Sequence, residues 1–75
     1  MKTLPNNSID NPMIARVIPK AHTQKMIRAL RDAGLPVNKL NAGYECRHPK
    51  TGELLFRAMN GARGYLCRFK ADLFV

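Results

Sequence analysis

The sequence predicts an α+β domain in which one amphipathic helix packs on a three-stranded antiparallel β-meander, behind a flexible N-terminal arm. Apolar residues recur at helical spacing within 20–33 and then at a spacing of two from residue 43 onward. The segments 49–52 and 60–61 contain turn-forming residues and divide the second region into strand-length parts. A chain of 75 residues has room for a single domain.

Residues 1–12 are expected to form the arm, because they are rich in Asn and Pro and show no periodicity. The domain then occupies residues 13–75, and its first segment, 13–18, is apolar apart from Arg16 and suits a short strand. Apolar side chains in the arm favour one that folds onto a partner, although a terminal segment without a role is the alternative. The residues predicted to contact a protein partner are Leu4, Ile9, Met13, Ile14 and Arg16.

The helix is expected over residues 20–33. Pro19 suits its first position, where a missing N–H costs nothing. Gly34 can adopt the left-handed conformation that ends a helix, and Pro36 prevents continuation. The apolar stripe that should face the sheet includes Met26, Ile27, Leu30 and Ala33.

Turn residues set the register of the meander. A Lys50-Thr51 turn closed by Gly52 pairs Pro49 with Glu53, His48 with Leu54, Cys46 with Phe56 and Glu45 with Arg57. An Asn60-Gly61 turn pairs Phe56 with Tyr65. Both registers separate the same two sets of residues, which supports them, because a slip by one residue would mix the faces.

The inner face of the meander should pack on the helix, and the outer face should be solvated and basic. The inner face is expected to collect Tyr44, Cys46, His48, Leu54, Phe56, Ala58, Tyr65, Cys67 and Phe69. The outer face is expected to collect Glu45, Arg47, Glu53, Leu55, Arg57, Leu66, Arg68 and Lys70.

The chain carries 13 Lys and Arg residues against 5 Asp and Glu residues, which gives a net charge of +8. Such a charge indicates a negatively charged partner, either nucleic acid or an acidic protein, with an ordinary solubilising surface as the alternative. Leu55 and Leu66 lie among the outer-face arginines, which favours protein docking, and no aromatic residue is available there for base stacking. The cations expected to contact the partner are Lys25, Arg28, Arg47, Lys50, Arg57, Arg63, Arg68 and Lys70.

No enzymatic activity is expected, because the sequence offers no catalytic pairing, P-loop or G-x-G-x-x-G motif. The cysteines and histidines lack the spacing of a zinc site, so neither a metal nor another cofactor is predicted. Two cysteines, Cys46 and Cys67, are expected to stay free in a reducing compartment, the cytoplasm. No apolar stretch approaches the ~18 residues of a membrane span, so no membrane partner is expected.

Three segments together give the chain a recognisable profile: the arm MKTLPNNSIDNPMI, the helix PKAHTQKMIRALRDAG and the basic meander GYECRHPKTGELLFRAMNGARGYLCRFK. In this profile the chain resembles the small basic transcription regulators that lytic phages, a Xanthomonas phage among them, direct against host RNA polymerase. The resemblance covers most of the chain and rests on no short signature motif.

The resemblance implies docking on the β′ amino-terminal region of the polymerase, near the β flap and the RNA exit channel. It also implies inhibition of initiation and antitermination, without catalysis. Two alternatives stay open: a basic protein that binds DNA or structured RNA directly, and a phage inhibitor of another host or defence enzyme.

Overall fold

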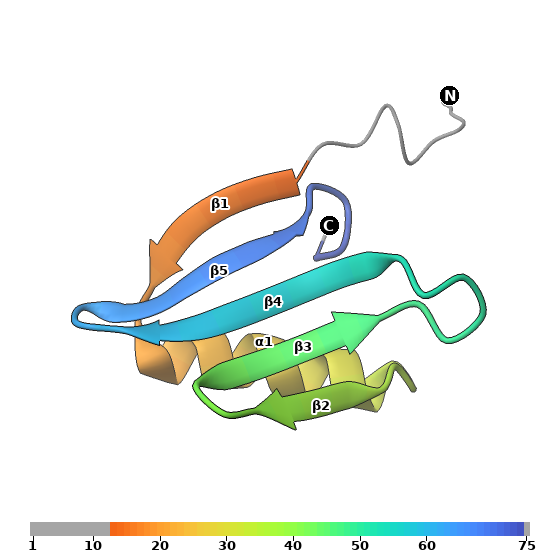
Figure 1. Ribbon diagram of the computed structural model, residues 1–75, viewed down its shortest axis with the longest axis horizontal. Helices are drawn as coiled ribbons and strands as arrows, with labels where there is room; N and C mark the ends of the chain where they lie inside the picture. The colour runs from red at the N-terminus through yellow and green to blue at the C-terminus, as the bar shows by residue number, and fades with distance from the viewer. Residues whose placement is uncertain (1–12, 75) are drawn as a thin grey trace.

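The computed structural model describes residues 13–74, which form one antiparallel sheet with one helix on one side of it (Figure 1). The elements are β1 (Met13–Ile18), α1 (Lys20–Asp32), β2 (Val37–Leu40), β3 (Gly43–Arg47), β4 (Leu54–Gly61) and β5 (Gly64–Lys70). The strand order is β1-β5-β4-β3-β2. The predicted α+β class is therefore confirmed, but the sheet has five strands and not three.

Helix α1 occupies nearly the predicted range and ends as predicted. Gly34 has a φ of 84°, its N–H donates to the Arg31 carbonyl at 2.9 Å, and the Leu35 N–H donates to the Leu30 carbonyl at 3.0 Å. This pattern is a Schellman motif. At the other end, Pro19 is the N-cap and not the first helical residue, because its ψ of 147° is extended.

The core lies between α1 and the inner face of the sheet. From the helix, Met26, Ile27 and Leu30 are buried as predicted, together with Thr23. From the three central strands, the buried side chains are Cys46, Phe56, Ala58 and Cys67. Tyr44, Tyr65 and Phe69 pack against this cluster and are half-buried. Met26, Ile27 and Leu30 therefore meet the central inner-face residues as predicted, whereas the prediction for Ala33 is wrong, because this residue is the exposed C-cap of α1.

The hairpin of β3 and β4 has the predicted register in its strands and a different one near its turn. Cys46 pairs with Phe56 and Glu45 with Arg57, as predicted. A bulge between Cys46 and Arg47 then pairs Arg47 with Leu54. The predicted pairs of His48 with Leu54 and of Pro49 with Glu53 are wrong, because the bulge places one extra residue in this hairpin.

The hairpin of β4 and β5 turns at Ala62-Arg63, and the predicted turn at Asn60-Gly61 is wrong. Strand β4 continues to Gly61, which pairs with Gly64, and Phe56 pairs with Phe69 instead of Tyr65. Gly64 follows the turn with a φ of 143°, which glycine adopts readily, and its lack of a Cβ lets β1 approach closely at Ile18. Because the shift from Tyr65 to Phe69 is an even number of residues, Arg57, Leu66 and Arg68 keep their predicted face.

The two outermost strands extend the meander on both sides. The predicted strand at 13–18 is present as β1, which pairs antiparallel with β5, so that Ile14 lies opposite Phe69. Strand β2 was not predicted and pairs with β3, with Val37 opposite Cys46. The half-buried side chain of Val37 packs on the edge of the core.

Candidate functional site

The face of the sheet opposite α1, here called the open face, has no helix over it among the described residues (Figure 1). Cross-strand pairing places two rows of side chains on this face. The first row contains Ala15, Arg68, Arg57 and Glu45 from successive neighbouring strands. The second row contains Val17, Leu66 and Met59. The predicted grouping of arginines with Leu66 and Met59 on one face is therefore confirmed, whereas Leu55, predicted to lie with them, is half-buried and packs against the core.

Arg57 and Arg68 form the centre of the first row. They are direct cross-strand partners, and Glu45 lies opposite Arg57 on its other side. Like charges directly opposite each other destabilise a sheet. The Arg57 Nε lies 4.0 Å from Glu45 Oε2, is shielded from solvent and has no hydrogen-bond partner in the described part of the chain. Among residues 13–74, Arg68 forms no ion pair, so the positive charge at this point is only partly compensated.

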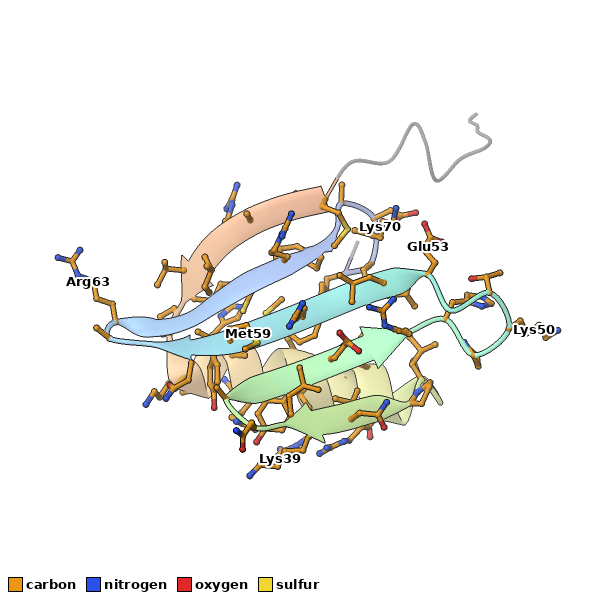
Figure 2. All side chains as sticks on the ribbon, in the orientation of Figure 1. Lys39, Lys50, Glu53, Met59, Arg63 and Lys70 are labelled. Carbon is orange, nitrogen blue, oxygen red and sulfur yellow. The ribbon has the colours of Figure 1, made fainter. Side chains whose placement is uncertain are left out.

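The other two predicted open-face cations, Arg47 and Lys70, form ion pairs within the protein. The Arg47 Nε donates to Glu45 Oε1 at 3.0 Å, and its Nη1 donates to the Gly52 carbonyl at 2.9 Å. The Lys70 Nζ lies 2.8 Å from Glu53 Oε2, and 14% of its side chain is exposed. Figure 2 labels both members of this second pair, near one end of β4 and β5. Arg57 and Arg68 are thus the open-face cations best placed to meet an external anion.

The second row supplies apolar surface next to the arginines. Val17 and Leu66 are opposite each other and are 58% and 49% exposed. Met59 continues the row on β4 and is half-buried (labelled in Figure 2). The contribution of Val17 was missed from the sequence, because it depends on the pairing of β1 with β5. Exposed apolar groups beside arginines are typical of protein-docking surfaces.

The remaining predicted cations are not part of the open face. Lys50 and Arg63 lie in the two hairpin turns, at opposite ends of the sheet (Figure 2). Lys25 and Arg28 are exposed on α1, which covers the other side of the sheet. The eight predicted cations therefore form separate groups and cannot all contact one flat surface.

The predicted protein-contact residues divide between β1 and the arm. Met13, Ile14 and Arg16 belong to β1, where Met13 pairs with Lys70 and Ile14 with Phe69. Leu4 and Ile9 lie outside the described residues. The backbone of 13–16 is already ordered in the sheet, so a partner could add only contacts to its side chains and to the free side of the strand.

The aromatic side chains of the strands lie on the inner face. Tyr44 and Tyr65 meet edge to face at a centroid distance of 6.1 Å, and Phe56 and Phe69 are paired across β4 and β5. Within the described strands, the open face carries no aromatic ring, as predicted. Stacking of nucleic-acid bases on this face therefore has no platform.

The thiols and histidines do not form a reactive cluster in the described part of the chain. Cys46 and Cys67 are free and buried on β3 and β5, with β4 between them. Burial raises the pKa of both thiols, and the hydrogen bond between Thr23 and Cys67 partly offsets this rise in the pKa of Cys67. The His48 Nδ1 accepts hydrogen bonds from the backbone N–H groups of Lys50 and Thr51 and so stabilises the turn. Over residues 13–74, no three His, Cys, Asp or Glu side chains gather as metal ligands would.

Comparison with known proteins adds no relative. No protein-family model matches the sequence, and no curated protein or solved structure gives a significant match. Among the described residues, no helix has the length and apolar character needed to cross a bilayer.

Proposed function

We propose that this chain is a non-enzymatic transcription regulator that binds bacterial RNA polymerase in the cytoplasm, inhibits initiation and promotes antitermination. The observation that carries the binding step is the opposed pair of Arg57 and Arg68, of which only Arg57 meets a carboxylate among the described residues, with exposed apolar neighbours beside it. The choice of polymerase, and of its β′ amino-terminal region near the β flap, rests on the resemblance of the sequence to phage regulators of transcription.

The open face suits an acidic protein surface for two physical reasons. An incoming carboxylate between the two guanidinium groups would relieve their mutual repulsion and form charge-assisted hydrogen bonds. Val17 and Leu66 are 58% and 49% exposed, so their complete burial would add about half of the roughly 1.5–3 kcal/mol that an exposed side chain gains, less the cost of association. The electrostatic part would raise the association rate, and the apolar part would slow dissociation.

The test compares two charge reversals that change the net charge equally. Arg68→Glu places a carboxylate opposite Arg57 and removes the repulsive pair, whereas Arg63→Glu changes the exposed turn between β4 and β5. Binding of the full chain to purified bacterial polymerase, and transcription from a promoter and through a terminator, are measured for both variants. We expect Arg68→Glu to lose binding and both transcriptional effects, and Arg63→Glu to retain them. Absence of binding by the unmodified chain would refute the proposal.

A second candidate function is direct binding of DNA or structured RNA. It is favoured by the net charge of +8 and by the cations that lie outside the open face. Phosphate-driven binding should weaken log-linearly with salt, by about 0.9 in slope for each duplex phosphate neutralised. A protein dock with an apolar centre should lose association rate with salt and keep much of its affinity. Titration of a DNA duplex, an RNA hairpin and polymerase over a range of salt concentrations separates the two.

A further inference from the structure

Strand β1 is one edge of the sheet, so one side of its backbone has no neighbouring strand among the described residues. It is six residues long, and Ala15, Arg16 and Val17 are exposed. The opposite edge, β2, is only four residues long. An exposed edge strand can accept a strand from another chain through main-chain hydrogen bonds.

A cleft of about 370 Å³ lies directly beside β1 on the helix side of the sheet. Its walls come from β1, from the beginning of α1 and from the C-terminal turn. The aromatic part is formed by Phe69 and Phe74, whose rings meet edge to face at a centroid distance of 5.6 Å. Phe74 is 37% exposed, so the apolar interior of the cleft is open to an incoming group.

Two basic side chains line this cleft. Arg16 lies opposite Cys67, so its side chain belongs to the inner face, and His22 belongs to the first turns of α1. Within residues 13–74, no carboxylate forms an ion pair with Arg16. The cleft therefore combines an apolar interior with an unpaired cation at the strand edge.

We propose that β1 accepts an extended segment of a partner protein, which pairs with its free side and carries a carboxylate next to apolar residues. The residue opposite Arg16 would be Asp or Glu, because directly opposed side chains on neighbouring strands approach closely. An apolar residue two positions away would lie on the same face and enter the cleft near Ile18 and Phe69. On the other face, the residue opposite Val17 would be apolar and would cover it.

The charge of this edge argues against a second copy of the chain as the occupant. Each copy carries a net charge of +8. Strand β1 contains no acidic residue that could pair with Arg16 of a second copy. A cation that points inward from an edge strand opposes pairing between identical edges. The same cation favours an acidic strand. This inference does not rest on the proposed function, because Arg16 points to the side of the sheet opposite Arg57 and Arg68, although Val17 belongs to both surfaces.

In the test, the full chain is the bait that selects binders from a library of random peptides displayed on phage. The most enriched peptide is then synthesised. We expect the enriched peptides to alternate apolar residues and to carry one acid. Arg16→Glu should weaken binding of the synthetic peptide about tenfold, and replacement of the peptide acid by Lys should restore binding to this variant. Methylation of alternate peptide backbone nitrogens should abolish binding, because it removes the donors needed for strand pairing.

Lys20→Glu is the matched control, since it changes the charge equally at an exposed residue that does not line the cleft. It should leave peptide affinity within twofold of that of the unmodified chain. The proposal is wrong if no peptide is enriched, if the methylated peptide binds equally well, or if Arg16→Glu and Lys20→Glu have the same effect. It is also wrong if the chain sediments as a dimer that Arg16→Glu dissociates. Loss of peptide binding in Arg68→Glu alone would assign the peptide to the open face instead.

Discussion

Arg57 and Arg68 lie directly opposite each other on β4 and β5, on the face of the sheet that α1 leaves open. The nearest carboxylate, Glu45, is opposite Arg57 on the other side and is also bonded to Arg47. A sheet built for stability alone would place opposite charges in such a pair. This arrangement therefore reduces stability slightly while concentrating positive charge where the proposed partner would bind.

Arg68→Glu should stabilise the fold while it weakens binding. The new cross-strand pair of opposite charges should raise the free energy of unfolding by about 0.2–1 kcal/mol at low salt. The gain should shrink at high salt, because exposed charges are screened. Urea unfolding at two salt concentrations measures it, with Arg63→Glu as the control of equal net charge. A stabilised variant that binds normally would show that the arginine pair has no role in recognition.

The faces of the sheet could be predicted more reliably than its pairing. The error in the hairpin of β4 and β5 came from Asn60-Gly61, a favourable turn sequence that instead forms the end of β4. Because the register moved by an even number of residues, Arg57 and Arg68 stayed on one face. The like-charge pair itself could not be predicted, since a turn at Asn60-Gly61 pairs Arg68 with Glu53.

The outer strands could be predicted only in part, because their pairing is non-local or their pattern is too short. The apolar run at 13–18, broken only by Arg16, indicated a strand, but nothing in the local sequence specifies β5 as its neighbour. The cleft beside β1 was missed for the same reason. In β2, the four residues Val37–Leu40 have apolar residues only at the two ends, which shows neither helical nor strand periodicity.

Gly43→Ala should destabilise the sheet severely. A Cβ atom at Gly43 would lie 1.9 Å from the Ala58 carbonyl oxygen, so β3 and β4 would have to separate there. We expect a loss of more than about 3 kcal/mol, or failure to fold. Gly52→Ala is the control: its φ of 77° is unfavourable for Ala, but no atom lies within 4 Å of the added Cβ. It should cost about 1–2 kcal/mol. Thermal unfolding compares the two, and similar losses would contradict this explanation.

Thr23→Val should weaken the junction between β1 and α1. The Thr23 side chain is fully buried, and its Oγ1 lies 3.1 Å from the Pro19 carbonyl and 3.7 Å from the Cys67 Sγ. Valine keeps the shape and removes the hydroxyl, which should cost about 0.5–1.5 kcal/mol. Urea unfolding measures the loss, and faster amide exchange in the first turn of α1 should accompany it. Gln24→Ala, at the exposed neighbouring residue, is the control and should change neither the free energy of unfolding nor the amide exchange.

The two buried thiols should make stability fall at alkaline pH. Burial raises the pKa of Cys46 and Cys67 above the ordinary thiol value of 9.0, so the folded state favours the neutral thiol. The unfolded chain loses its thiol protons first, and stability is therefore complete below pH 9.0 and decreases as the pH rises further. Urea unfolding across this range measures the decrease, and the variant with both Cys46→Ala and Cys67→Ala should show a smaller slope.

In the folded protein, both thiols should react slowly with a thiol reagent until urea unfolds the chain. Rapid labelling of either thiol without unfolding would contradict the described core.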